Sequence, residues 1–332
     1  METIQLGRTG VQVSPLCLGT MNFADRTPEE ESTRILDYAI DAGINFIDTA
    51  DFYGHVLDDG RGMGHTEERL GRYFASRGTR RRIVLATKFF APTDRGDPNA
   101  RGGSRRHVIQ ACEDSLRRLQ TDYIDLYQMH RPDSEVPIDE TLRALDDLIR
   151  AGKVRYIGGS GFPAWRIVES LWVSRELRLN RFVTEQAKCN LLRRDAEPEV
   201  IPMAQAHEIA LLGYQPLGAG VLSGKYRRND EPPSDSRLGD PVWSRYYRSS
   251  YLTEAAFDVV EALESMAASK GCTASQLATA WVLTRPSMAS AIIGPRTLDQ
   301  LEDSLGALGV DWSEEELATI DEVAPGPNQQ QR

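Results

Sequence analysis

The sequence is poor in the features that several classes of protein require. No C-x-x-C pair and no histidine at metal-ligand spacing accompany its cysteines, so we expect reduced thiols and no metal site. No run of about 18 apolar residues, the length of a membrane-spanning helix, occurs. The chain has 39 basic against 49 acidic residues and a net charge of −10, which argues against nucleic acid as a partner. The cysteines are Cys17, Cys112, Cys189 and Cys272.

The two ends of the chain carry little pattern. The first residues, METIQLGRTG, lack a basic region followed by an apolar stretch, so we expect a cytoplasmic protein. Residues 325–332 are rich in proline and glutamine, and we expect them to be disordered. The rest has a composition close to the globular average, 40% hydrophobic and 27% charged, and we expect residues 1–324 to form one domain.

Short apolar runs alternate regularly with longer segments of helical period. The runs are 16–19, 45–48, 83–87, 123–129, 154–158, 182–185, 211–215 and 289–293. The helical segments include 29–42, 66–76, 104–119, 138–151, 164–175 and 298–308. Eight β-then-α units at this length predict an α/β fold of the (β/α)₈ TIM-barrel type. A doubly wound open sheet is the alternative, but no G-x-G-x-x-G follows the first run, where a dinucleotide fingerprint would lie.

Two further features complete the predicted architecture. Residues 4–6 and 11–13 flank the turn residues 7–10, which predicts an N-terminal β-hairpin that caps the barrel floor. Three long connections, 55–65, 89–103 and 227–250, follow predicted strands. Because loops after strands lie on the C-terminal face of a barrel, these loops are candidates for the pocket walls.

Four polar side chains follow the ends of neighbouring predicted strands. Asp48 ends one strand and Tyr53 lies just beyond it, while Lys88 and His130 follow the next two strands. A phenol with a pKa of about 10 is a poor acid at neutral pH. A neighbouring ammonium lowers that pKa, and a buried carboxylate holds the lysine charged. A histidine can orient a carbonyl group while a nicotinamide delivers hydride and the tyrosine protonates the oxygen.

The chain resembles the aldo-keto reductases over nearly its whole length. The residues that carry the resemblance are 6–10, 18–21, 48–50 with 53–54, 66–68, 115–119, 122–130 and 152–158. The resemblance implies that Tyr53 is the general acid, that Lys88 and Asp48 tune it, and that His130 orients the substrate carbonyl. Within the family, the chain is most similar to ketoreductases of bacterial antibiotic pathways and to potassium-channel β-subunits.

The same resemblance implies an NADPH site. Ser160 and Gln186 match the positions that hold the carboxamide, and Tyr214 matches the aromatic residue that stacks on the nicotinamide. Residues 217–225 resemble the loop along the pyrophosphate, and Arg296 is placed to meet a 2′-phosphate, which favours NADPH over NADH. The full predicted set is Gly19, Thr20, Ser160, Gln186, Tyr214, Pro216, Leu217, Gly218, Gly220, Leu222, Gly224, Lys225, Gly294, Arg296, Gln300, Asp303 and Ser304.

Three positions depart from the common family pattern. Gly161 replaces an asparagine, which removes one amide partner for the nicotinamide. Cys189 replaces a tyrosine before Asn190, and Gln215 replaces a serine before Pro216. None of these changes touches the four predicted catalytic residues, but each alters the hydrogen bonding expected around the cofactor.

The predicted activity is the reduction of a ketone or aldehyde small molecule by NADPH. The resemblance implies a polyketide ketone or a nucleotide-linked keto-deoxysugar as substrate. An NADPH-binding redox sensor with negligible turnover is the alternative, against which the intact set of four residues weighs. Reduction of a conjugated double bond is a third option, but relatives with that activity usually lack the histidine. The many aromatic residues in 227–250 favour a homo-oligomer.

Overall fold

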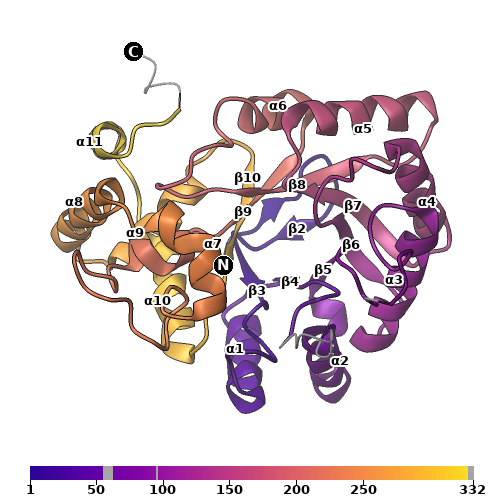
Figure 1. The fold of residues 1–332 in the computed structure, drawn as a ribbon, viewed down its shortest axis with the longest axis horizontal. Helices are drawn as coiled ribbons and strands as arrows, with labels where there is room; N and C mark the ends of the chain where they lie inside the picture. Colours follow the sequence, from indigo (N-terminus) through magenta and orange to yellow (C-terminus); the bar gives the residue numbers. More distant parts are fainter. Residues whose placement is uncertain (55–62, 95, 328–332) are drawn as a thin grey trace.

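The protein folds around a closed barrel of parallel strands (Figure 1). The computed structural model describes residues 1–54, 63–94 and 96–327. Around the barrel, the strands pair in the order β10-β3-β4-β5-β6-β7-β8-β9, and β9 pairs with β10 to close the sheet. The barrel strands are β3 (Leu16–Gly19), β4 (Phe46–Asp48), β5 (Val84–Phe89), β6 (Ile124–Met129), β7 (Val154–Ser160), β8 (Phe182–Lys188), β9 (Ala210–Tyr214) and β10 (Met288–Ile293). The predicted (β/α)₈ barrel is confirmed.

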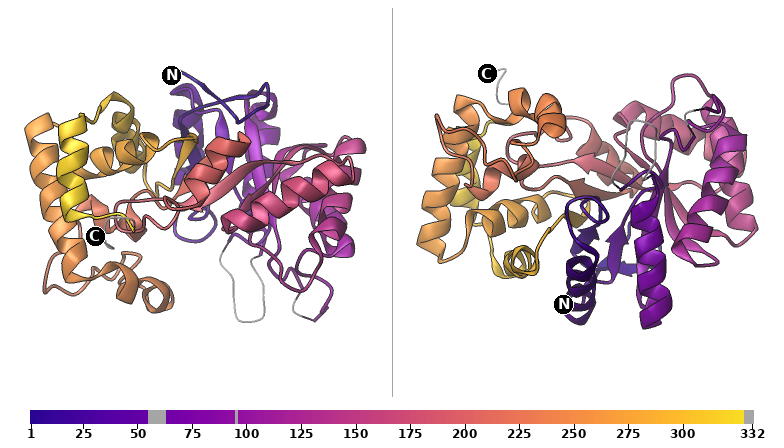
Figure 2. Two further views of the ribbon diagram at one scale, coloured as in Figure 1. Left: turned by 90° about the horizontal axis from the view of Figure 1, so that it is seen from above. Right: turned by 60° about the horizontal axis from the view of Figure 1, so that its bottom comes forward.

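Helices connect successive strands and flank the strands in both views of Figure 2. The α-helices are α1 (Glu29–Asp41), α2 (His65–Arg77), α3 (Arg105–Leu119), α4 (Ile138–Arg150), α5 (Ala164–Glu176), α6 (Val200–His207), α7 (Pro241–Tyr251), α8 (Glu254–Lys270), α9 (Ala274–Leu283), α10 (Leu298–Gly306) and α11 (Glu314–Val323). Short 3₁₀ helices are η1 (Arg80–Arg82), η2 (Gly218–Ser223) and η3 (Ala307–Gly309). Within the described residues, no helix has the length and apolar character needed to cross a membrane.

The strands are buried on both faces, which explains why they appear in the sequence as continuous apolar runs. Side chains such as Phe46, Leu126 and Leu212 fill the barrel interior, and a larger apolar layer lies between the strands and the helices. The N-terminal strands β1 (Ile4–Gln5) and β2 (Gln12–Val13) pair antiparallel. Leu6 and Val13 beside them join the interior cluster, so the hairpin closes the barrel floor as predicted.

The structure differs from the predicted elements mainly at the C-terminal ends of strands. β5, β7 and β8 each extend two or three residues past the predicted bound, to Phe89, Ser160 and Lys188. In the sequence, the apolar pattern ends before the hydrogen-bonded strand does, because the strands end in polar side chains at the barrel mouth. The prediction that residues 227–250 form a loop is wrong, because most of the second half of this segment forms α7. The predicted loop 55–65 and tail 325–332 fall largely on residues 55–62 and 328–332, which lie outside the described residues.

Candidate active site

β4 and β5 bring three of the four predicted catalytic side chains into contact at the mouth of the barrel. Lys88, on β5, has an Nζ that donates to Asp48 Oδ1 at 2.5 Å and to the Thr49 carbonyl oxygen at 2.8 Å. The same Nζ lies 3.4 Å from the Tyr53 hydroxyl oxygen. The side chains of Lys88 and Asp48 are 0% and 3% exposed, so the ion pair is sequestered from water.

The second oxygen of Asp48 is held by two amides from other strands of the barrel. Gln128 Nε2 on β6 donates to Asp48 Oδ2 at 3.1 Å, and Gln186 Nε2 on β8 donates at 3.0 Å. Gln128 was missed by sequence reasoning. Its place two residues before His130, on the same strand face, was the available signal. The two amides hold the Asp48 carboxylate in the orientation in which its other oxygen accepts from Lys88.

His130 lies across the mouth from Tyr53. Its backbone N–H donates to the Phe89 carbonyl oxygen at 2.9 Å, which fixes the chain just past the end of β6. The His130 ring meets the Tyr53 ring edge-on, with centroids 5.9 Å apart, and the Phe52 ring at 5.3 Å. His130 Nδ1 is buried without a hydrogen-bond partner. The structure therefore brings all four predicted residues to one opening.

The electrostatic environment keeps Lys88 charged and His130 neutral. Burial acts to lower the pKa of Lys88, but Asp48 and Tyr53 more than offset it, so the net shift is upward. Withdrawal from water lowers the pKa of His130 well below 6.5, and Lys88 and Arg131 act in the same direction. A neutral imidazole can still donate one N–H to a carbonyl oxygen.

The expected lowering of the tyrosine pKa is wrong in its net direction. Withdrawal of the phenol from water raises the pKa of Tyr53, and this outweighs the opposing effect of the Lys88 ammonium. The sequence argument considered the neighbouring charge without the desolvation. A raised pKa keeps Tyr53 protonated at neutral pH, which is the state that a proton donor requires.

The segment after β9 forms a tight, glycine-rich turn at the same end of the barrel. Gly218, Ala219 and Gly220 have φ angles of +52°, +57° and +91°, in the left-handed region, and Gly224 has +73°. Gly220 needs glycine because of its backbone conformation, since a residue with a side chain is strained at a φ of +91°. Tyr214, at the end of β9, is half-buried beside this turn.

Four basic side chains gather next to this turn. Partial burial lowers the pKa of Lys225 to about 8, although the residue still reaches solvent, and Arg296, Arg237 and Arg26 act in the same direction. The Arg296 guanidinium also donates to the Asp235 carbonyl oxygen at 2.7 Å. Arg26 is paired with Asp240, but a cluster of several basic side chains is still typical of a site for an anionic group such as a phosphate.

The remaining predicted cofactor residues lie in four places. Thr20 Oγ1 donates to the Asp48 carbonyl oxygen at 3.0 Å, directly after β3, where a Cβ on Gly19 would meet Ile292 of β10. Ser160, at the end of β7, donates to the Gln186 carbonyl oxygen at 3.3 Å. Pro216, Leu217 and Leu222 belong to the turn after β9 or its flank, and Gly294 follows β10.

Residues on α10 divide between the predicted phosphate region and a neighbouring helix. Gln300 Oε1 accepts the Arg296 backbone N–H at 2.9 Å, and Ser304 Oγ donates to the Gln300 carbonyl oxygen. Asp303 Oδ1 instead accepts from Thr273 at 2.8 Å and from Gln276 at 3.1 Å, the pair that caps α9. This oxygen of the carboxylate is therefore occupied in joining α10 to α9.

Two of the three departures have local structural consequences. Gly161 has a φ of +66°, and the next backbone N–H, of Phe162, donates to the buried Glu185 Oε1 at 2.8 Å. Gln215 has a φ of +57° and hydrogen-bonds to two tyrosines of α7. The replacement at Cys189 leaves a buried thiol, and nothing in its surroundings explains it.

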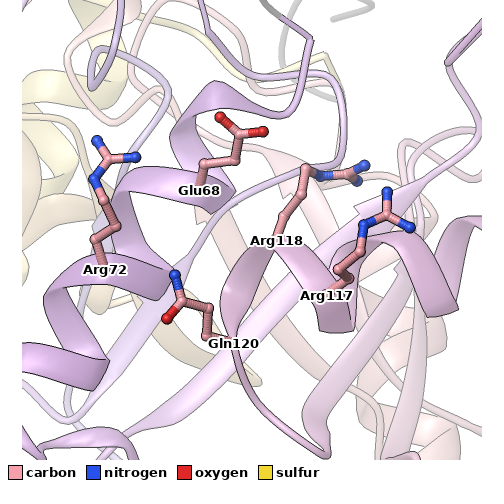
Figure 3. Close-up of a pocket in the computed structure, with 5 residues that line it drawn as sticks. All are labelled: Glu68, Arg72, Arg117, Arg118 and Gln120. Atoms are coloured by element: carbon pink, nitrogen blue, oxygen red, sulfur yellow. The ribbon is translucent and has the colours of Figure 1, made fainter.

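A separate cavity of about 270 Å³ lies between α2 and α3 on the outside of the barrel (Figure 3). Three arginines, Glu68 and Gln120 line it. The arginines are engaged in ion pairs, Arg72 with Glu29, Arg117 with Asp114 and Arg118 with Glu67. None of these residues belongs to the predicted site, so we assign the cavity no part in the chemistry.

Comparison with known proteins identifies the family. The model of the Aldo/keto reductase family matches residues 15–325. The chain belongs to the aldo/keto reductase family. This aldo/keto reductase is an oxidoreductase that acts on carbonyl groups, and its family generally uses NAD(P)H.

Its relatives include bacterial, plant and fungal proteins. The uncharacterized oxidoreductase YrpG of Bacillus subtilis (strain 168) is 39% identical, over 98% of this chain and 97% of that protein. A probable voltage-gated potassium channel subunit beta of Oryza sativa subsp. japonica is 33% identical, over 93% and 92%. The norsolorinic acid reductase stcV of Emericella nidulans is 33% identical, over 95% and 79%. These aldo/keto reductase relatives thus cover nearly the whole of this chain.

Proposed function

We propose that this aldo/keto reductase is an NADPH-dependent reductase of ketones and aldehydes, with Tyr53 as the proton donor. The observation that carries the proposal is the position of Lys88 Nζ, 2.5 Å from Asp48 Oδ1 and 3.4 Å from the Tyr53 hydroxyl. In this arrangement the phenol is the acid, and its phenolate is stabilised by the ammonium, which the carboxylate holds in place.

In the proposed reaction, the carbonyl group is reduced to an alcohol at the mouth of the barrel. NADPH, when bound, supplies hydride to the carbonyl carbon. Tyr53 transfers its hydroxyl proton to the carbonyl oxygen, and Lys88 stabilises the phenolate left behind. Asp48, oriented by Gln128 and Gln186, holds Lys88 charged and in place. His130, neutral at physiological pH, donates an N–H to the carbonyl oxygen and orients it.

The residues present suit a bound dinucleotide. The cations around Lys225 supply charge for phosphate groups, and the left-handed backbone of Gly218–Gly220 forms a tight turn beside them. Ser160 and Gln186 would hold the carboxamide, and Tyr214 would stack on the nicotinamide. The other contacts are assigned to Gly19, Thr20, Pro216, Leu217, Leu222, Gly224, Gly294, Gln300, Asp303 and Ser304.

The choice of NADPH over NADH rests on Arg296. Its guanidinium lies among the cations that lower the pKa of Lys225, at the start of α10. A guanidinium can bind a 2′-phosphate through two parallel hydrogen bonds, which NADH cannot use. We therefore assign recognition of the 2′-phosphate to Arg296.

For the substrate, we propose a ketone of secondary metabolism. A relative that is 33% identical is named a norsolorinic acid reductase, and one that is 30% identical a versiconal hemiacetal acetate reductase. A polyketide ketone and a nucleotide-linked keto-deoxysugar are the two substrate classes. NADPH oxidation followed at 340 nm with simple aldehydes and with both classes tests the proposal. Binding of NADPH without oxidation by any carbonyl would refute it.

The alternative is an NADPH-binding redox sensor with negligible turnover. It is favoured by the relative named as a probable voltage-gated potassium channel subunit beta, which covers 93% of this chain. The same assay separates the two functions, because a sensor would bind NADPH tightly yet consume it at a rate independent of added carbonyl. The single domain over 1–324, the cytoplasmic location and the homo-oligomer stay predictions, and a light-scattering mass would test the last.

A further inference from the structure

The turn that follows β7 is held to β8 by three hydrogen bonds. β7 and β8 are neighbours in the barrel (Figure 1), and their pairing places Ser160 beside Gln186. The Gln186 carbonyl oxygen accepts from Ser160 Oγ at 3.3 Å and from the Gly161 backbone N–H at 3.0 Å. The third bond runs from the Phe162 backbone N–H to Glu185 Oε1 at 2.8 Å. Three consecutive residues thus take their positions from two residues of β8.

Glu185 supports this turn from the outer face of the sheet. Gln186 Nε2 donates to Asp48 Oδ2 at 3.0 Å, so the Gln186 side chain lies inside the barrel. Because successive side chains of a strand alternate between its faces, Glu185 lies on the outside. A Cβ built on Gly159 would lie 2.7 Å from Glu185 Oε2, which places the carboxyl directly against the β7 backbone. Ser160 pairs with Gln186 and therefore faces the interior, opposite to the carboxyl.

The hydrogen bond to Phe162 accounts for a carboxyl group in this position. Glu185 is 0% exposed, and its Oε2 has no hydrogen-bond partner within the described residues. Burial raises the pKa of Glu185 well above 4.5, although the backbone N–H groups of Phe162 and Gly161 oppose the shift, so the uncharged form is favoured. An apolar side chain of the same size would avoid the cost of the unpartnered oxygen. It would not accept the Phe162 N–H.

The backbone that this bond fixes has few other constraints. Gly161 has a φ of +66°, and nothing lies within 4 Å of where its Cβ would be, so no side-chain packing holds this residue. Phe162 is 3% exposed, and its ring meets the Phe182 ring edge-on with centroids 5.8 Å apart. The Phe162 N–H belongs to the peptide group that joins these two conformations. Its bond to Glu185 therefore fixes the plane of that peptide.

We propose that Glu185 is a positioning residue for the nicotinamide, holding the turn Ser160–Phe162 in the conformation in which Ser160 meets the carboxamide. The inference rests on the NADPH site of the proposed function and goes beyond it, because Glu185 acts through the backbone and not by contact with the cofactor. Gly161 provides no side chain to the nicotinamide, so the orientation of the ring depends more strongly on a fixed Ser160.

The experiment compares two ligands that differ only in the nicotinamide end. They are NADPH and 2′-phospho-ADP-ribose, which carries the same phosphates without the nicotinamide, and isothermal titration gives the Kd of each. We expect Glu185→Met to weaken NADPH about fivefold to tenfold and 2′-phospho-ADP-ribose less than twofold. Methionine matches the length of the glutamate side chain but offers only a weakly accepting sulfur, so the substitution keeps the packing and removes the bond.

A conservative variant and a matched control isolate the hydrogen bond. Glu185→Gln keeps an acceptor for the Phe162 N–H and should hold both Kd values within about twofold of the wild type. Asp146, on α4, accepts the Asn180 backbone N–H at 2.8 Å just before β8 begins, at the opposite end of that strand. Asp146→Leu removes this similar bond and should leave the ratio of the two Kd values unchanged. Circular dichroism and the thermal midpoint of each variant establish that it is folded.

A double-mutant cycle tests whether Glu185 acts through Ser160. In the wild-type background, Ser160→Ala should weaken NADPH about fivefold and leave 2′-phospho-ADP-ribose unchanged. In the Glu185→Met background, the same substitution should cost less than about twofold, because the turn no longer presents Ser160 to the carboxamide. Additive losses would show that the two residues act independently and would overturn the positioning role.

The other outcomes separate this inference from the function on which it rests. Equal weakening of the two ligands in Glu185→Met, or a Glu185→Gln variant as weak as Glu185→Met, would overturn the role of Glu185 and leave carbonyl reduction intact. A Ser160→Ala variant with an unchanged ratio would overturn both that role and the carboxamide contact. No oxidation of NADPH by any carbonyl, in a wild type that binds NADPH, would overturn the reductase function alone, because the turn is tested by binding.

Discussion

The buried pair Asp48 and Lys88 allows stability and catalysis to be separated by substitution. In Asp48→Asn, one carbonyl oxygen must serve the donors that two carboxylate oxygens now serve, Lys88 Nζ, Gln128 Nε2 and Gln186 Nε2. The ammonium, 0% exposed, also loses its countercharge. Breaking a buried ion pair by removing one partner costs about 3–5 kcal/mol. We expect the free energy of unfolding to fall by about that much, and the thermal midpoint by about 4–7 °C.

The double variant Asp48→Asn/Lys88→Met removes both charges. Because no uncompensated charge then remains in the core, its unfolding free energy should return to within about 1–2 kcal/mol of the wild type. Its reductase activity should stay at least about a hundredfold below the wild type, since Tyr53 has lost the charge that stabilises its phenolate. Urea unfolding followed by circular dichroism, with NADPH oxidation on the same samples, measures both. A single variant as stable as the wild type, or a double variant that recovers turnover, would refute the reasoning.

Three further predictions concern the individual roles. Tyr53→Phe should lower kcat by at least about a hundredfold while the Kd for NADPH, from fluorescence titration, changes less than about threefold; retained turnover would remove Tyr53 from the acid role. Arg296→Ala should weaken NADPH by about 10- to 100-fold and NADH by less than threefold, and equal weakening would contradict recognition of the 2′-phosphate. For reduction at saturating NADPH, kcat/KM for the carbonyl substrate should stay level from about pH 6 to 9, because His130 titrates well below 6.5 and Tyr53, which must be protonated, loses its proton only above 10; an inflection near pH 6.5 would show a histidine that changes charge.

The architecture was predictable because each buried strand leaves a continuous apolar run and each helix an amphipathic one. The ends of the strands were less predictable. β8 runs on through Gln186 and Lys188, whose polarity reflects the barrel mouth rather than the end of the ladder. Helix α7 was missed because its aromatic and basic composition is that of a pocket loop, although Asp240 followed by Pro241 is a recognisable helix start.

The four predicted catalytic residues could be located because each lies at the end of a strand or just past it, a position that parallel topology brings to one edge. Gln128 was missed because its one signal was its place two residues before His130 on the same strand face, and the role of an amide inside a strand becomes clear only when the facing strand is known. The direction in which the pKa of Tyr53 shifts also depends on how much water surrounds the phenol, which sequence alone does not specify. Likewise, the partners of Gln215 emerge only when α7 is placed.

The pairing of β3 with β10 has a consequence for how the protein matures. Ala291, Ile292 and Ile293 lie beside Leu16, Cys17 and Leu18, so the first and last strands of the barrel can pair only after every residue between them has been synthesised. A nascent chain that stops before residue 288 has an unpaired edge on β3 and another on β9. Such an incomplete chain is open to aggregation through these edges, so chaperone contact during synthesis is most needed before the final strand appears.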